Sequence, residues 1–292
     1  MASPAPQSSA EKAVVANHRT VLQLFAGACL ALAAGCRLTT PLAPQAGAPP
    51  SVAAVAARPN PANHEFYPLD PGSRWHYRAS LLRRVHHPDG TIEVVTDDHF
   101  ELATELTCSD TSGGHTWQVE RRFESFANGT SATAWNMYRQ DRDGLWGAAA
   151  GAIDPCAQGL PAGTVGDRQL AYPLRPGASW VVREGFFPIV ATVEAQDVLD
   201  LPIGRVTAWR VRLDRPGIYE PGHDYSLAWY GRTGFLQSVT HLEDSVLVRG
   251  GLLGVLEAEM RQTLDDVQLA SPGRFAPDGA LAQRRTGATD PR

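Results

Sequence analysis

Titratable residues gather on both sides of one predicted turn. The sequence Pro-Asp-Gly at 88–90 is typical of a β-hairpin turn, because glycine supplies the positive φ that such turns require. The flanking titratable residues are His86, His87, Asp97, Asp98 and His99. Imidazole nitrogens and carboxylate oxygens are ligands of divalent metals. The hairpin over 86–99 is therefore a candidate metal-dependent or hydrolytic centre, and the alternative is a solvated hairpin with no joint role for these side chains.

A second titratable group, formed by Glu220, His223 and Asp224, lies in a predicted Pro-Gly loop. Acid–base catalysis in this loop would require a buried pocket that shifts a pKa. The sequence gives no sign of such burial, so an exposed loop is the alternative interpretation.

The motifs of several common enzyme classes are absent from the sequence. The chain has no G-x-S-x-G nucleophile elbow, P-loop, G-x-G-x-x-G fingerprint or H-E-x-x-H zinc motif. The formal net charge is −5 and no basic patch dominates, which argues against a nucleic-acid partner. We therefore expect no cofactor, and a binding or scaffolding role instead of catalysis.

The segment Leu24–Cys36 has the composition of a secretion signal. It belongs to an uncharged apolar stretch that is too short to span a bilayer, and it ends in small residues directly before Cys36. Small residues followed by cysteine resemble the bacterial lipobox, in which the cysteine is lipidated and becomes the mature N-terminus. We expect residues 1–35 to be a signal peptide and Cys36 to carry the lipid (palmitate and related acyl chains). The alternatives are an ordinary cleaved signal peptide and a cytosolic protein.

The remaining cysteines indicate the redox compartment. Cys29 and Cys36 belong to the signal, which leaves Cys108 and Cys156 for the folded part. Two such cysteines often pair in an oxidising cell envelope, although two buried free thiols are the alternative. No C-x-x-C motif suggests a redox or zinc site.

Composition divides the rest of the chain into three parts. Residues 36–62 are rich in proline and alanine and predict a disordered tether, and residues 271–292 predict a disordered tail. Residues 63–270 are long enough for one domain with its own core. With an acylated Cys36, the membrane would be a partner of the protein. The residue after Cys36 is arginine, which favours the outer membrane as its location.

Alternation of apolar and polar residues predicts antiparallel strands. In one segment Trp117 and Val119 share a face while Glu120 and Arg122 lie on the opposite, solvated face, and a similar pattern covers 205–213. Less regular strands are expected at Arg74–Val85, Thr91–Thr107, Ser131–Gln140, Pro188–Leu199, Tyr225–Arg232, Phe235–Leu242 and Leu252–Leu269. Turn sequences separate them at 87–91, 142–145, 201–205 and 232–235. The fold class is therefore mainly β, as a single curved antiparallel sheet or open half-barrel.

Tryptophan is abundant for a chain of this kind. The usual explanation is packing on the faces of the sheet. The alternative is an apolar groove that holds an acyl chain or a hydrophobic partner segment. The candidate groove residues are Trp75, Trp117, Trp180, Trp209 and Trp229.

One short sequence occurs twice in the chain. The segments 67–75 and 172–180 share Tyr-Pro-Leu-x-Pro-Gly-x-x-Trp. The Pro-Gly pair predicts a turn, and the flanking leucine and tryptophan are apolar enough to close one end of a sheet. The repeat suggests a duplicated half, although the residues between the copies do not align.

At these residues the chain resembles a group of uncharacterised bacterial lipoproteins. Those proteins share an F-P-L-x-x-G-x-x-W-x-Y opening, matched here by Pro68, Leu69, Gly72, Trp75 and Tyr77. A later W-Y-x-x-x-x-G-L-V-K-S strand is matched by 229–238. The resemblance implies a fold like that of the half-barrel lipoprotein carriers of the LolA/LolB type, and an envelope protein that binds or scaffolds a lipid or protein partner.

Overall fold

The computed structural model describes residues 67–184, 188–215, 224–248, 251 and 253–270. These residues all belong to one compact unit, Pro61–Arg292. The expected signal peptide, the tether and the tail, together with Cys36, lie outside the described residues.

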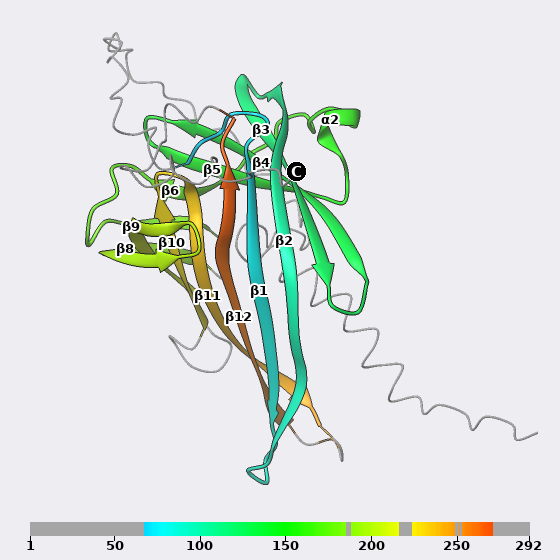
Figure 1. The fold of residues 1–292 in the computed structure, drawn as a ribbon. Helices are drawn as coiled ribbons and strands as arrows, with labels where there is room; N and C mark the ends of the chain where they lie inside the picture. Colours follow the sequence, from blue (N-terminus) through cyan, green and yellow to red (C-terminus); the bar gives the residue numbers. More distant parts are fainter. Residues whose placement is uncertain (1–66, 185–187, 216–223, 249–250, 252, 271–292) are drawn as a thin grey trace, which may run out of the picture. The chain divides into compact units, whose positions relative to one another are not determined.

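Nearly all of the described residues form strands (Figure 1). The strands are β1 (Arg74–His86), β2 (Ile92–Ser112), β3 (His115–Phe126), β4 (Ser131–Asp141), β5 (Gly144–Gly151), β6 (Asp167–Ala171), β7 (Ser179–Arg183), β8 (Ile189–Leu201), β9 (Gly204–Arg215), β10 (Asp224–Gly231), β11 (Gly234–Leu247) and β12 (Leu253–Gln268). A short helix, α2 (Pro155–Gln158), begins at the N-cap Asp154. No helix within the described ranges has the length and apolar character needed to span a bilayer.

The strands form one sheet in the order β6-β5-β4-β3-β2-β1-β12-β11-β10-β9-β8-β7. Each neighbouring pair is antiparallel, so the sheet consists of two six-stranded meanders joined by pairing of β1 with β12. The two outermost strands approach each other through side chains. Trp180 Nε1 of β7 donates to the Arg168 carbonyl of β6 at 3.1 Å, and Arg183 pairs with Asp167 at 2.9 Å. The sheet is therefore curled until its edges meet.

The curl gives the sheet an inner face that is packed with aromatic residues at one end. Tyr67, which precedes β1, has its ring centroid 6.2 Å from Trp75 of β1 and 5.6 Å from Tyr138 of β4. Tyr77 of β1 and Tyr230 of β10 both contact Phe235 of β11, each with centroids 5.7 Å apart. Because β4 and β10 are far apart in the sheet, these contacts define the enclosed side, which we call the inner face.

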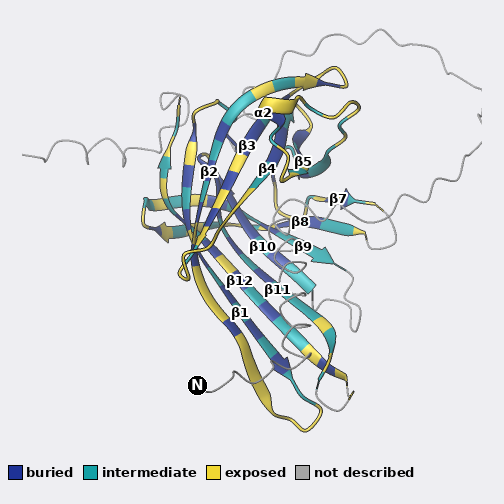
Figure 2. Cartoon of the chain, turned by 90° about the vertical axis from the view of Figure 1, so that its right-hand side faces the viewer, coloured by how far each residue is buried: buried dark blue, intermediate teal, exposed yellow. Residues whose placement is uncertain are grey.

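Alternation along the strands then sets which residues are buried (Figure 2). Along β1 every second residue from Trp75 to Val85 is buried. Residues that lie directly opposite each other on paired antiparallel strands share a face, so the register extends the inner face to the neighbouring strands. The inner face of β12 opposite β1 includes Ala258, Met260 and Gln262.

The repeated sequence forms the same turn twice. The amide of Gly72 donates to Leu106 O and the amide of Leu106 donates to Ser73 O; the amide of Gly177 donates to Val193 O and the amide of Val193 to Ala178 O. Gly72 and Gly177 have φ of 91° and 81°, in the left-handed region. Each turn opens the first strand of one meander and fixes it to the second strand. The repeat therefore has one structural role in both halves of the sheet.

The expected single curved antiparallel sheet is confirmed. The segments with alternating patterns are strands, including the last one, and all four predicted turn sequences connect paired strands. Strands β5, β6 and β7 were not predicted. The sequence of β5 is rich in glycine and alanine, and β6 and β7 have five residues each, so none of them shows a clear alternation.

Substitution of the repeated glycine should destabilise the fold. Gly177→Ala places a Cβ in the left-handed region, which costs about 1–2 kcal/mol. Gly177→Asn should cost less, because asparagine tolerates this conformation better than alanine does. Urea unfolding of the two variants would measure the difference, and equal stability of Gly177→Ala and the unaltered protein would contradict this account of the turn.

Candidate functional site

The five candidate groove tryptophans lie on two faces of the sheet. Trp75 is on the inner face, as is Trp209, which lies opposite Tyr230. Trp180 lies opposite Ala191 of β8. Ala191 and Val193 share one face of β8, and Val193 lies opposite the inner-face residue Val211. Trp180 therefore also faces inward. Trp229 lies opposite Arg210 and its Nε1 donates to Asp197 at 2.8 Å, on the outer face.

Trp117 is also on the outer face, where it is fully buried with Val119 and Met137. The expectation that these five tryptophans line one groove is therefore wrong. Trp117 alternates regularly with the inner-face residue Glu120 along β3, and the extra residue Thr107 in β2 places Cys108 on the same outer face as Val119.

On β3, charged residues that we expected from the sequence to be exposed to solvent are instead buried on the inner face. Glu120, Arg122 and Glu124 are only 4%, 5% and 5% exposed. Their cross-strand neighbours on β2 are Leu106, Thr104 and Leu102, which all belong to the inner face. On its other side Glu120 lies opposite Asn136 of β4. We call Glu120, Arg122, Glu124, Thr104 and Asn136 the inner polar cluster.

Hydrogen bonds and an ion pair hold this cluster together. Asn136 Nδ2 donates to Glu120 Oε1 at 3.0 Å. The Arg122 guanidinium donates through Nε to Glu124 Oε1 at 3.0 Å, and its NH2 group lies 2.9 Å from the same oxygen. Buried charges are expensive unless they are paired in this way. The pairing explains how the sheet accommodates these three charged side chains on a face that also carries aromatic and apolar residues together with Arg83, Ser226, Ser238, Thr240 and Gln262.

Burial raises the pKa of the Glu120 carboxyl above its ordinary value. The Asn136 amide, the Arg122 charge and the hydroxyls of Tyr138 and Thr104 oppose this rise, because each favours the ionised carboxylate. The cluster therefore presents a guanidinium, an amide and a carboxyl that gains a proton more readily than an exposed glutamate does. Such a group of polar side chains on an apolar face can orient the polar end of a ligand.

The structure does not bring the titratable residues of the 86–99 hairpin together into the candidate centre, which agrees with the alternative of a solvated hairpin. His86 Nε2 lies 2.8 Å from Glu257 of β12, and His87 Nε2 lies 3.2 Å from Glu93. Asp97 and Asp98 are paired instead with Leu82 and Leu81, several residues away along β1. Among the described residues, no group of three or more His, Cys, Asp or Glu side chains could hold a metal ion. His99 lies 3.9 Å from Asp97 in an exposed pair.

Of the second titratable group, the structure describes Asp224 alone; Glu220 and His223 lie outside the described residues. Asp224 Oδ1 accepts a hydrogen bond from the Glu243 amide at 2.7 Å. Partial burial raises the pKa of the Asp224 carboxyl. The contact fixes β10 to β11 near the start of β10.

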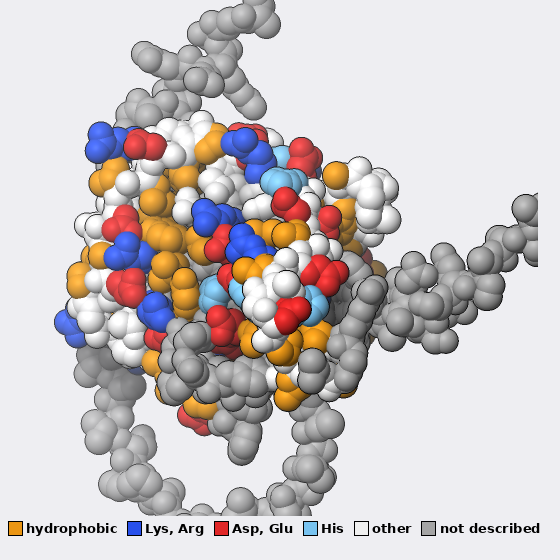
Figure 3. Space-filling view, turned by 90° about the horizontal axis from the view of Figure 1, so that it is seen from below, with side chains coloured by type: hydrophobic (Ala, Val, Ile, Leu, Met, Phe, Trp, Pro, Cys, Tyr) orange, Lys and Arg blue, Asp and Glu red, His pale blue; other side chains and the backbone are white. Residues whose placement is uncertain are grey.

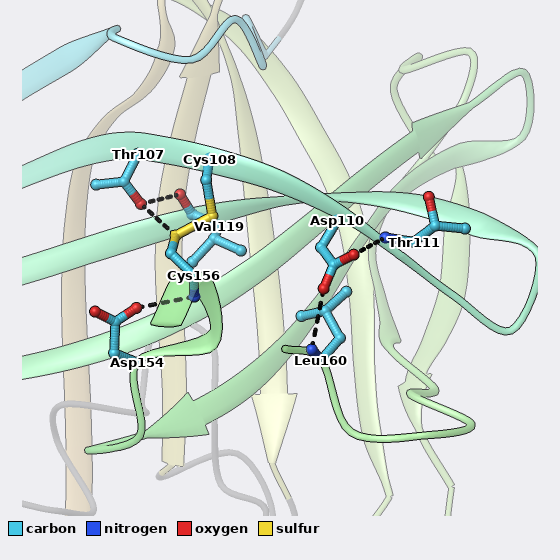
Figure 4. Close-up of a disulfide and its surroundings, with 8 residues drawn as sticks. All are labelled: Thr107, Cys108, Asp110, Thr111, Val119, Asp154, Cys156 and Leu160. Atoms are coloured by element: carbon cyan, nitrogen blue, oxygen red, sulfur yellow. Dashed lines mark hydrogen bonds between the residues drawn. A yellow bond between two sulfur atoms is a disulfide. The ribbon is translucent and has the colours of Figure 1, made fainter. Parts of the chain in front are cut away.

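Cys108 and Cys156 form a disulfide with an S–S distance of 2.00 Å (Figure 4). It joins β2 to α2, and two further bonds fix the segment that follows. The Leu160 amide donates to Asp110 at 3.2 Å, and Ser112 Oγ donates to the Pro161 carbonyl at 2.8 Å. Leu160 packs on the outer cluster of Trp117, Val119 and Met137. The expected pairing of the two cysteines is thus present, and it holds a cover over an apolar part of the outer face.

A depression of about 360 Å³ lies on the outer face over β1, β2, β3 and β12. Its charged wall is an ion-paired group in which Glu105 bridges Arg74 at 2.7 Å and Arg121 at 2.8 Å. Phe123 contributes an apolar wall and is 42% exposed. The side chains of Arg74 and Arg121 are 61% and 50% exposed, so this ion-paired group is largely solvated, unlike the buried inner polar cluster.

Neither the inner polar cluster nor the outer depression was predicted from the sequence. The sequence of β3 held one weak sign of the inner polar cluster. Its charged residues alternate regularly as Glu-x-Arg-x-Glu, and the segments on either side of it in the chain also form strands. Alternation alone does not tell which of the two faces is enclosed.

No protein-family model and no curated protein sequence matches the chain. Two solved structures are similar at low identity. A Bacteroides fragilis protein, described as exported and as having a YmcC-like fold, has 11% identity, a TM-score of 0.37, and coverage of 70% of this chain and 98% of its own. A Parabacteroides distasonis protein described as a lipoprotein has 9% identity, a TM-score of 0.34, and coverage of 69% and 97% respectively.

Removal of the disulfide should destabilise the protein strongly. The bridge closes a loop with a sequence separation of 48 residues. In the loop-entropy model such a bridge contributes about 4 kcal/mol. Urea unfolding of Cys108→Ala with Cys156→Ala should show most of this loss, and a reductant should then have little further effect. A double variant as stable as the unaltered protein would contradict the role of the bridge.

The raised pKa of Glu120 predicts a pH-dependent stability. An acid whose pKa is raised by folding binds its proton more tightly in the folded state, so stability is fully present below the unfolded pKa and falls as pH rises through the folded pKa. Glu120→Gln should remove this fall, whereas Glu101→Gln, at an exposed site on β2, should retain it. Unfolding free energies measured from pH 4 upward would test this, and an identical pH profile for Glu120→Gln would contradict it.

Proposed function

We propose that the protein is a cell-envelope lipoprotein, anchored through acylated Cys36, that binds an amphipathic ligand on the inner face of its sheet. The observation that carries the proposal is the inner polar cluster. A guanidinium, an amide and a protonatable carboxyl lie together on a face that also carries many apolar residues. This combination suits a molecule with one polar end and an apolar chain.

The neighbouring inner-face residues support an apolar chain as the remainder of the ligand. Leu102 lies directly opposite Glu124, and the face continues along β2 to Phe100 and along β1 to Leu81. If the polar head of the ligand bound beside Arg122, its acyl chain would lie along these apolar residues. A lipid is therefore the ligand class that we propose.

A binding role is favoured over a catalytic one. Of the two titratable groups that suggested catalysis from sequence, the one over 86–99 is not brought together, as shown above for His86, His87, Asp97 and Asp98. In the inner polar cluster each charged group is engaged by a partner within the cluster, which suits recognition of a polar head.

The disulfide supports an envelope location. A cross-link between Cys108 and Cys156 persists in oxidising compartments and is rare in the cytosol. Together with the lipobox-like sequence before Cys36, it favours export followed by anchoring, and the outer membrane is the location that we propose.

The anchor can be tested by metabolic labelling with palmitate. The full chain expressed in a bacterial host should be labelled and should fractionate with the outer membrane. Cys36→Ser should abolish the label, whereas Cys29→Ser should retain it. An unlabelled full chain, or a label retained by Cys36→Ser, would overturn the anchor.

The ligand can be tested by native mass spectrometry of the full chain extracted from the envelope in mild detergent. We expect a co-purifying lipid mass that is lost in Arg122→Met with Glu124→Leu. This double variant removes both charges of the pair, so it leaves no unpaired buried charge. Arg212→Met with Asp214→Leu removes a similarly spaced ion pair of β9, whose two side chains are 30% and 45% exposed, and should retain the lipid. No bound lipid in the unaltered protein, or equal lipid in both variants, would refute the inner-face site.

A further inference from the structure

The end of the sheet formed by the β1–β2 and β11–β12 hairpins carries an exposed apolar patch. Its aliphatic side chains are 36–72% exposed, and they are Ile92, Val94, Leu247, Leu253 and Val255. We call these five residues the tip patch. Viewed from this end, hydrophobic side chains lie at the surface beside acidic and histidine side chains (Figure 3).

The register places the tip patch on one face. Ile92 and Val255 both lie opposite His86, one on each side of β1. Val94 lies opposite Arg84, which shares the outer face with His86. Leu247 and Ser245 share one face of β11. Leu247 lies opposite Leu253, and Ser245 lies opposite Val255. The five side chains therefore form one outer surface over β2, β12 and β11, with β1 between them.

An apolar outer surface is unusual here because the inner face of β1, the central strand of the tip, is already buried. Val85 of β1, one residue before His86, is 7% exposed on the inner side. Antiparallel strands with one buried face normally carry polar residues on the other. Large exposed apolar side chains gathered on one surface are typical of sites that contact a partner.

The charge around the tip patch is strongly acidic. The basic residues of 84–98 and 243–257 are Arg84 and Arg249, and Arg249 lies outside the described residues. The acidic residues on the outer face of the same ranges are Asp97, Glu243 and Glu257, with Asp89 in the turn, whereas Glu93, Asp98 and Asp244 lie on the inner face. Arg84 is itself paired with Glu257 at 3.6 Å. A partner that covers the tip patch would therefore gain from positive charge.

From these observations we infer that the tip patch docks a cationic amphipathic segment of another polypeptide, with an apolar stripe flanked by lysine or arginine. Four neighbouring strands spaced by about 4.8 Å give a surface about 14 Å across. This width matches one α-helix, which is about 10–12 Å in diameter with its side chains. The inference does not depend on the inner-face site, because the two sites lie on opposite faces.

Two other occupants fit the surface less well. A second copy would bring two acidic ends together, which is unfavourable. An anionic bilayer would be repelled for the same reason. The tip patch also lies about 40 Å along β1 from Trp75, the end at which the chain arrives from Tyr67 and the expected anchor.

The test uses the full chain in nanodiscs of zwitterionic lipid and a fluorescent synthetic helix made of leucine and lysine. Anisotropy should show binding above that of empty nanodiscs, and the affinity should fall as salt is raised. Leu247→Ser with Leu253→Ser should weaken binding at least tenfold. Val165→Ser with Val181→Ser alters valines that are 86% and 48% exposed elsewhere, and should leave the affinity unchanged.

A charge variant provides a second measurement if the apolar variant fails to fold. Glu243→Lys with Glu257→Lys, two outer-face residues that lie opposite each other, should weaken binding of the leucine–lysine helix at least tenfold and remove most of its salt dependence. Equal affinity of the tip variants and the unaltered protein would overturn the inference. It would also be overturned by equally tight binding of a leucine–glutamate helix, by tip-dependent binding to anionic vesicles in place of the peptide, or by tip-dependent self-association seen in sedimentation.

Discussion

The packing of Tyr67 between Trp75 and Tyr138 is the contact on which the enclosed side of the sheet depends. An antiparallel sheet of twelve strands has two edges, and here no backbone ladder joins β6 to β7. The edges are linked by the connecting residues 172–178 and by side-chain contacts, so the inner face must be filled for the curl to be stable. Aromatic side chains bury large areas and can reach across such a space. Tyr67 fills it from outside the sheet, at the end where both β1 and the β10–β11 turn meet.

The curl of the sheet around Tyr67 also buries the charged side chains of the inner polar cluster. Glu120, Arg122 and Glu124 would be ordinary solvated residues on an open strand. Once β4 and β10 face each other across the interior, the same side chains lose water and must find partners, which they do in Asn136 and in one another. The cost of burying these charges is a reason to expect a role for them beyond stability, because apolar residues of similar volume would often fold as well.

The two halves of the sheet share one construction. In each half the Tyr-Pro-Leu-x-Pro-Gly-x-x-Trp sequence sets a left-handed glycine, and two backbone hydrogen bonds fix the first strand to the second. The tryptophan then donates to a backbone carbonyl, Trp75 to Thr233 of the β10–β11 turn at 2.6 Å and Trp180 to Arg168 of β6 at 3.1 Å. The halves differ at their junctions, since β1 pairs with β12 whereas β6 and β7 touch through side chains.

The sequence by itself determined the strands outside β5, β6 and β7, the four hairpin turns and the repeated turn, and it favoured pairing of the two cysteines. These depend on local chemistry: alternation with period two, glycine at positive φ, and the redox preference of a pair of cysteines. Only the tertiary structure decided which side of each strand is enclosed. The direction in which the sheet curls put Glu120 inside and Phe123 outside, and it placed the five candidate tryptophans on two different faces. A face is buried because of what packs over it, and those residues come from strands far away in the chain.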